Sequence, residues 1–234
     1  MRAEPADSSE RLPPEQSLTR WSEVHAAVML SMTLLVAAKV LPLPLFAVSA
    51  LASFLVLLWR QRGLWTPHGG FGLANWITLL RLTGVLGLLG SSATGKEAVA
   101  VGLFLWLLDG VDGWLAVRLR LTSPFGDLFD KETDAFFTLT LAILLYHALG
   151  VPAWILLCGG LRYGFVLALK LGRRQACALS PLPLARPIGA AALFGLIFGL
   201  WPPPAAYHWV LATLTAALVI SFSLSGWTIL KAPR

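Results

Sequence analysis

Four aspartates stand out in this sequence because they lie in pairs, at helical spacings, in a chain that is otherwise strongly apolar. Asp109 and Asp112 are three residues apart, and Asp130 and Asp134 are four apart. Residues at these spacings share one face of a helix. Two such faces turned toward each other would gather four oxygen-donor side chains at one point. The sequence therefore predicts a carboxylate site between two neighbouring helices.

A cluster of four carboxylates needs a counter-charge, because like charges in a low-dielectric site repel strongly. Carboxylate oxygens suit Mg²⁺, Mn²⁺ or Ca²⁺, and two metal ions at such a site typically clamp a phosphoryl transfer. We expect no Lys or Arg on the same two helical faces, so we expect divalent cations to supply the positive charge. The alternative interpretation is a buried polar network that only ties the two helices together.

The composition is that of an integral membrane protein. Hydrophobic residues make up 57% of the 234 residues and charged residues only 13%, against about 25% charged residues in an ordinary soluble domain. Six of the 12 acidic residues lie between positions 109 and 134. Carboxylates inside a membrane are costly and mark function. We attribute the net charge of +6 to cytosolic loops and anionic lipid. No nucleic acid partner is expected, because no basic cluster is interleaved with exposed aromatics.

The apolar runs predict an all-α membrane protein of about eight transmembrane helices. Basic residues concentrate in one set of loops and tails, which places both termini and the turn after the first aspartate pair in the cytosol. One of the first two runs has the alternative of a re-entrant or interfacial segment. The predicted helices cover about residues 24–40, 44–59, 72–91, 97–118, 126–149, 152–170, 186–201 and 205–229.

The stretch that holds the aspartates resembles the signature of the CDP-alcohol phosphotransferases, D-x2-D-G-x2-A-R-x8-G-x3-D-x3-D. One position departs, because Val117 stands where the family has Arg and Arg118 follows one residue later. One residue corresponds to about 100° of helical rotation, so Arg118 points elsewhere than the family's Arg. The matching residues are Asp109, Asp112, Gly113, Ala116, Gly126, Asp130 and Asp134.

The resemblance implies a fold, an activity and a set of site residues. It implies a six-helix catalytic membrane domain at residues 70–229, which would follow a cytosolic disordered tail at 1–22 and an extra transmembrane hairpin at 23–62. It implies transfer of a substituted phosphoryl group from a CDP-alcohol, such as CDP-diacylglycerol, to a hydroxyl acceptor with release of CMP. The resemblance also implies a homodimer. We expect the membrane to be a bacterial inner membrane.

The resemblance further assigns roles. Asp134 would be the general base, and two Mg²⁺ or Mn²⁺ ions would be held by Asp109, Asp112, Asp130 and Asp134. The residues implied to bind the nucleotide are Asp112, Gly113, Ala116, Gly126, Asn75 and Thr78. Asn75 has the alternative role of a helix N-cap, and the two glycines have the alternative of close helix packing.

Several arginines remain outside this signature. Arg81 follows Thr78 on the same predicted helix and is interpreted either as an interface residue that snorkels to the headgroups or as a substrate contact. Arg162 is central in a predicted helix, where a lone cation is expensive. We expect it to pair with an acidic residue of the motif stretch, with contact to a lipid phosphate as the alternative. Candidates to bind substrate phosphate, besides their contribution to cytosolic loop charge, are Arg118, Arg173, Arg174 and Arg186.

Three alternatives to the preferred interpretation remain open. The family also includes enzymes that transfer an aminoalcohol phosphate from CDP-choline to diacylglycerol, and the signature addresses only the shared CDP portion. A transporter that carries ions on its carboxylates is a different class, but its polar residues would be expected near the membrane midplane. A non-catalytic family member is the third, and the departure at Val117 is its only support.

Overall fold

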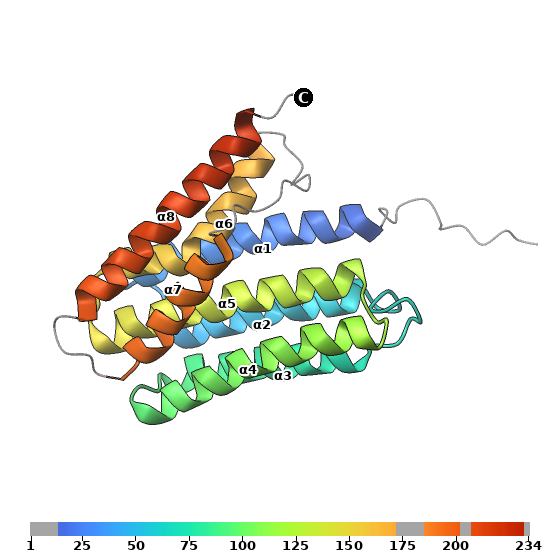
Figure 1. Cartoon of the computed structure of the whole chain (residues 1–234), viewed down its shortest axis with the longest axis horizontal. Coiled ribbons are helices and arrows are strands. Elements are labelled where there is room, and N and C mark those ends of the chain that lie inside the picture. The colour runs from blue at the N-terminus through green and yellow to red at the C-terminus, as the bar shows by residue number, and fades with distance from the viewer. Residues whose placement is uncertain (1–13, 172–184, 202–206, 232–234) are drawn as a thin grey trace, which may run out of the picture.

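The structure is a computed structural model that describes residues 14–171, 185–201 and 207–231, and every regular element in these ranges is helical. The predicted all-α fold with eight helices is therefore confirmed for the described residues (Figure 1). The helices are α1 (Pro14–Ala37), α2 (Leu43–Arg60), α3 (Leu73–Ser91), α4 (Lys96–Arg118), α5 (Pro124–Leu149), the short 3-10 helix η1 (Ala153–Ile155), α6 (Leu156–Leu171), α7 (Ala185–Gly199) and α8 (Tyr207–Lys231).

Five helical segments in the described part of the chain are long and apolar enough to cross a membrane, so the protein is a multi-pass integral membrane protein. They are α2, α3, α4, the continuous η1–α6 segment and most of α8. The apolar part of α7, Pro187–Gly199, is shorter. Helices α1 and α5 carry charged and polar side chains in their N-terminal halves. This polar content distinguishes them from the five apolar segments that can cross a membrane.

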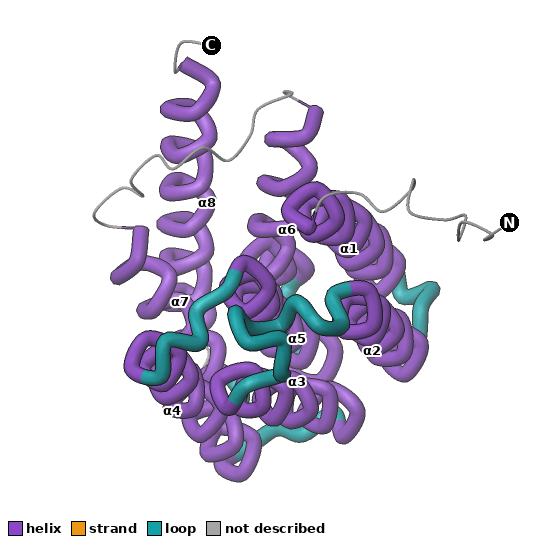
Figure 2. Tube along the Cα trace, turned by 90° about the vertical axis from the view of Figure 1, so that its right-hand side faces the viewer, coloured by secondary structure: helices purple, strands orange, loops and turns teal. Residues whose placement is uncertain are grey.

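Helix α5 forms the centre of the bundle, with α1, α3, α6 and α7 packed around it (Figure 2). From Ala135 to Leu145 only Thr138 is not buried, which matches the predominantly apolar sequence of this segment. A glycine, Gly159, allows α6 to approach closely, because a Cβ at that position would overlap the backbone of Leu139. Small residues permit such close helix contacts in membranes. The helix that carries Asp130 and Asp134 is thus fixed on several sides.

Helix α1 begins earlier than the sequence pattern predicted. Residues 14–22, which were assigned to a disordered tail, are helical, while residues 1–13 lie outside the described ranges. Leu18, Trp21 and Ser22 are buried. Trp21 Nε1 donates to Ser53 O of α2, and Ser22 Oγ donates to a carboxylate of α5. The polar composition of this segment suggested a tail, but two of its side chains, Trp21 and Ser22, hydrogen-bond to α2 and α5.

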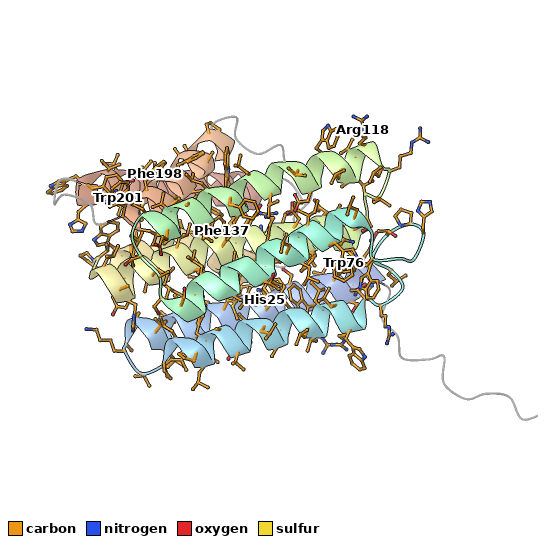
Figure 3. The ribbon with its side chains drawn as sticks, turned by 90° about the horizontal axis from the view of Figure 1, so that it is seen from below. His25, Trp76, Arg118, Phe137, Phe198 and Trp201 are labelled. Atoms are coloured by element: carbon orange, nitrogen blue, oxygen red, sulfur yellow. The ribbon has the colours of Figure 1, made fainter. Side chains whose placement is uncertain are left out.

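The α2–α3 and α4–α5 connections lie at the same end of the bundle, because the first five helices alternate in direction (Figures 1 and 2). Trp76 and Arg118 mark this end in Figure 3, and Phe198 and Trp201 mark the opposite end. The two aspartate pairs, near the end of α4 and the start of α5, therefore come together at one end of the bundle.

Candidate active site

The four aspartates of the motif surround one guanidinium group, that of Arg81 from α3. Arg81 Nη1 lies 2.9 Å from Asp112 Oδ2 and 2.7 Å from Asp130 Oδ1. Its Nη2 lies 2.7 Å from Asp109 Oδ1 and also contacts Asp134 Oδ1. The predicted meeting of the two aspartate pairs is thus observed, and a third helix supplies its centre.

The expectation that no basic residue shares the aspartate faces is wrong, and so is the interpretation of Arg81 as a snorkelling residue. The Arg81 side chain is only 2% exposed. It reaches the cluster because α3 packs against both α4 and α5. One guanidinium still leaves three negative charges uncompensated if all four carboxylates are ionised. The demand for further positive charge therefore remains after Arg81 is counted.

Three of the carboxylates have the proximity that a metal site requires. Asp109, Asp112 and Asp130 each place one oxygen within 4.8 Å of the others. Asp134 joins them through the shared guanidinium. Asp112 is almost fully buried, whereas Asp109, Asp130 and Asp134 are 35%, 37% and 46% exposed. An all-oxygen, negatively charged and accessible donor set fits a hard divalent cation such as Mg²⁺ or Mn²⁺.

A cavity of about 190 Å³ adjoins the aspartate cluster, between α3, α4 and α5. Asp112 and Asp130 belong both to the cluster and to the cavity wall. Val117, which replaces the family's Arg, also lines the cavity and is 71% exposed. All six residues that the resemblance implied for nucleotide binding line this cavity: Asn75, Thr78, Asp112, Gly113, Ala116 and Gly126.

The two motif glycines occupy different surroundings. A Cβ added at Gly126 would lie 3.1 Å from Asn75 Oδ1 and 3.3 Å from Ser123 Oγ, so this glycine permits a close contact between α5 and α3. A Cβ at Gly113 would meet nothing within 4 Å. Packing thus explains Gly126 in part, whereas the position of Gly113 favours clearance for a ligand.

Hydrogen bonds to one carbonyl oxygen fix two residues of the cavity wall, Asn75 and Ser123. Asn75 is not the N-cap of α3, because Gly72 holds that position; its Nδ2 instead donates to Trp65 O at 3.1 Å. Ser123 Oγ donates to the same oxygen at 2.7 Å and caps the first turn of α5. Sequence reasoning missed Ser123, although Ser followed by Pro124 is a typical helix start. Thr78 Oγ1 donates to Asp112 Oδ2 at 2.9 Å, which orients that carboxylate.

A single buried carboxylate, Glu132, lies on the opposite face of α5. Glu132 is 1% exposed, and its Oε1 accepts from Arg162 Nη2 at 2.8 Å and from Ser22 Oγ at 3.0 Å. The prediction that Arg162 pairs with an acidic residue of the motif is confirmed. This pair joins α5 to α6 and α1, on the side away from the cavity.

The remaining candidates lie at the surface or outside the described residues. Arg118 is exposed and its guanidinium lies over the Trp114 ring, 4.8 Å from the centroid, so it does not line the cavity. Asp127 and Lys131 form an exposed pair at 2.6 Å, and Asp127 also lines the cavity. Arg173 and Arg174 lie outside the described residues. Arg186 belongs to α7, but its side chain also lies outside them.

Comparison with known proteins agrees with the motif. A family model described as CDP-alcohol phosphatidyltransferase matches residues 71–222. The chain is also 32% identical over 142 residues to a CDP-diacylglycerol--glycerol-3-phosphate 3-phosphatidyltransferase of Pseudomonas fluorescens, a match that covers 57% of this chain and 71% of that protein. No solved structure gives a significant match. The region that the family model matches contains the cavity and all four aspartates, and it excludes α1 and α2.

Proposed function

We propose, because the chain belongs to the CDP-alcohol phosphatidyltransferase family, that it transfers the phosphatidyl group of CDP-diacylglycerol to a hydroxyl acceptor and releases CMP. The observation that carries this proposal is the contiguity of two features. The first is a cluster of four aspartates that carries more negative than positive charge. The second is a cavity lined by every residue implied to bind the nucleotide, and Asp112 and Asp130 belong to both. A diphosphate that enters the cavity would meet the cluster directly.

The aspartates would hold the metal ions of the reaction. Asp109, Asp112 and Asp130 would bind one Mg²⁺ or Mn²⁺ ion, and Asp134 would contribute to a second. When bound, such ions neutralise the non-bridging phosphate oxygens and stabilise the departing CMP. Arg81 offsets part of the negative charge, and its planar fork holds carboxylates from α4 and α5 in fixed positions.

Asp134 would act as the general base. It is the most exposed of the four carboxylates, so an acceptor hydroxyl can reach it. Asp134 would take the proton from that hydroxyl, whose oxygen would then form a bond to the phosphorus that carries diacylglycerol. The bond from this phosphorus to the oxygen of the CMP phosphate breaks, and CMP leaves. Thr78 supports this step by holding Asp112 in place from α3.

The site end of the bundle would face the cytosol of a bacterial inner membrane, where soluble acceptors are available. The loops and helix termini at this end carry Arg60, Arg62, Arg118 and Arg120, in agreement with the positive-inside rule for the cytosolic side. The division into a hairpin at 23–62 and a catalytic domain at 70–229 belongs to the same proposal, as does a homodimer.

The proposal is tested by CMP release from the purified full chain in liposomes with Mg²⁺ or Mn²⁺. Glycerol 3-phosphate is the first acceptor to offer with CDP-diacylglycerol, because the relative from Pseudomonas fluorescens is named for it; inositol, inositol phosphate and serine follow. We expect metal-dependent release that requires one of these acceptors. Release only from CDP-choline with diacylglycerol would instead identify an aminoalcohol phosphotransferase. Binding of neither CDP nor CMP would contradict the proposal.

A further inference from the structure

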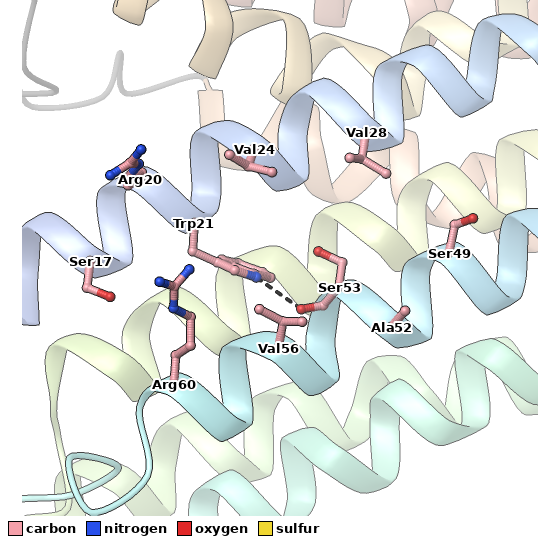
Figure 4. A pocket seen from close by; sticks show the side chains of 10 residues that line it. All are labelled: Ser17, Arg20, Trp21, Val24, Val28, Ser49, Ala52, Ser53, Val56 and Arg60. Carbon is pink, nitrogen blue, oxygen red and sulfur yellow. Dashed lines mark hydrogen bonds between the residues drawn. The ribbon is translucent and has the colours of Figure 1, made fainter. Parts of the chain in front are cut away.

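A second concave surface lies between α1 and α2, outside the region that the family model matches. This groove has a volume of about 330 Å³ and shares no residue with the cavity beside the aspartates. It is lined by Ser17, Arg20, Trp21, Val24, Val28, Ser49, Ala52, Ser53, Val56 and Arg60 (Figure 4). The chemistry of this lining indicates what the groove can hold.

The two helices contribute matching stripes to this groove. On α1, Arg20 is followed by Val24 and Val28 at intervals of four residues; on α2, Val56 and Arg60 are also four residues apart. Such spacing keeps each set on one helical face. Because the helices run in opposite directions, both arginines lie at the same end of the groove (Figure 4). From Arg20 to Val28 an apolar wall runs for about 12 Å, at 1.5 Å per residue.

The arginine end of the groove carries uncompensated positive charge. Arg20 and Arg60 are both exposed, and neither has a carboxylate within 4 Å in the part of the chain that the structure describes. The nearby Glu23 of α1 is paired with Lys170 at 2.6 Å. Two free guanidiniums at one end of an apolar surface are suited to a phosphate that is attached to an apolar chain.

The polar groups in the body of the groove are already satisfied within the protein. Trp21 Nε1 donates to Ser53 O at 3.0 Å, which fixes the indole against α2. Ser53 Oγ is 2.8 Å from His25 Nδ1, and Ser49 Oγ donates to Leu45 O at 2.8 Å. The valines, by contrast, remain open: Val24 is 55% exposed and Val56 44% exposed. The body of the groove therefore presents an effectively apolar surface to its occupant.

We propose that this groove binds one anionic phospholipid, with the headgroup phosphate between Arg20 and Arg60 and an acyl chain along Val24, Val28 and Val56. The charge at one end selects the phosphate, and the net negative headgroup distinguishes this lipid from a zwitterionic one. The apolar stripe buries methylene groups of the chain, each of which favours binding. The site is separate from the donor site and does not depend on the proposed reaction.

The test is the retention of phosphatidylglycerol by the full chain, measured by native mass spectrometry after purification with equal amounts of phosphatidylglycerol and phosphatidylcholine. Wild type is expected to retain phosphatidylglycerol preferentially. The double variant Arg20→Gln/Arg60→Gln removes the phosphate contacts, and Val56→Trp fills the groove while both arginines stay. Each is expected to lower the retained phosphatidylglycerol at least about tenfold, which corresponds to about 1.4 kcal/mol of lost binding free energy.

Two matched controls separate the groove from general effects. Arg62→Gln removes an exposed arginine two residues from Arg60, and Val48→Trp adds an indole to an exposed position on α2; neither position lines the groove. Both are expected to retain phosphatidylglycerol within twofold of wild type. Melting temperatures in detergent verify that every variant is folded, and Arg60→Gln alone serves if the double variant is not.

Three results would overturn the proposal. The first is equal retention of phosphatidylglycerol and phosphatidylcholine by wild type. The second is undiminished retention in Val56→Trp, because attraction to the arginines alone would then account for binding. The third is a loss in Arg62→Gln as large as that in the double variant.

Discussion

Helix α5 carries carboxylates on two faces, and the two faces are built in opposite ways. Asp130 and Asp134 look toward Arg81, where four carboxylates share one guanidinium and three of them are more than a third exposed. Glu132 looks toward Arg162, where one carboxylate meets one guanidinium and is 1% exposed. The first face has an excess of negative charge and is open, whereas the second is balanced and closed.

This difference distinguishes a site from an anchor. A buried ion pair that is charge-matched gives little net stability but is strongly destabilising when one partner is removed. A cluster with more carboxylates than cations instead stores repulsion that a bound cation relieves. Glu132 therefore holds α1 and α6 against α5, and the aspartates keep their capacity for a ligand. Both functions lie within five residues of one helix.

The largest effect is expected for Asp134→Asn. CMP release should fall by about 10³-fold, because general bases typically contribute 10²–10⁴-fold. The metal-free protein should not lose stability, since the change removes one of the repelling charges. Glu97→Gln is the control: it also replaces a carboxylate with its amide, at an exposed residue in the first turn of α4, at the other end of that helix from Asp109 and Asp112. Activity losses of equal size in the two variants would contradict the assignment of Asp134.

The second largest effect is expected for replacement of Arg81, the cation that the four aspartates share. Arg81→Gln should lower the free energy of unfolding of the metal-free protein by about 3 kcal/mol, because four carboxylates are left without their guanidinium. Saturating Mg²⁺ should recover part of this loss, since bound ligand stabilises the folded state. Unfolding in mixed micelles with and without Mg²⁺ measures both values. An identical loss in the two conditions would show that the cluster does not respond to a divalent cation.

A substitution at Glu132, on the opposite face of α5, should lower the stability of the protein more than its activity. Glu132→Gln should cost about 2 kcal/mol, because Arg162 loses a charged partner while Ser22 retains an acceptor. Below the melting temperature of the variant, its CMP release should remain within about threefold of wild type. A loss comparable with that of Asp134→Asn, in a protein that is still folded, would mean that Glu132 belongs to the active site.

A smaller effect on stability is expected when Glu132 and Arg162 are both replaced. Glu132→Leu/Arg162→Leu should destabilise the protein less than Glu132→Gln does, because no unpaired charge remains and apolar side chains fill the space. The comparison of the two variants by unfolding in mixed micelles tests whether this pair is structural. A double variant that is less stable than the single one would indicate a requirement for the ion pair itself.

Local spacing accounts for what could be predicted from the sequence. The aspartate pairs were predictable because intervals of three and four define a helical face, and Glu132, two residues from each of Asp130 and Asp134, lies about 200° around the same helix. An acidic partner for Arg162 was predictable because a lone cation in an apolar helix is costly, although its identity as Glu132 was not. These inferences need no knowledge of how distant helices pack.

What was missed depends on packing between distant segments. Arg81 precedes Asp109 by 28 residues, and nothing in the spacing of α3 shows that it turns toward α4 and α5. The helical start at Pro14 was missed because polar residues such as Ser22 resemble a tail until their partner on α5 is known. The joint hydrogen bonding of Asn75 and Ser123 to Trp65 O likewise requires three segments to meet.

The central claim is that the open face of α5 binds divalent metal and the closed face does not. Its most direct test is Mn²⁺ binding to the full chain, followed by electron paramagnetic resonance, in wild type, Asp130→Asn and Glu132→Gln. We expect wild type to bind Mn²⁺, Asp130→Asn to bind it at least about tenfold more weakly, and Glu132→Gln to bind it within twofold of wild type. Equal weakening by the two substitutions, or no Mn²⁺ binding by wild type, would contradict the account.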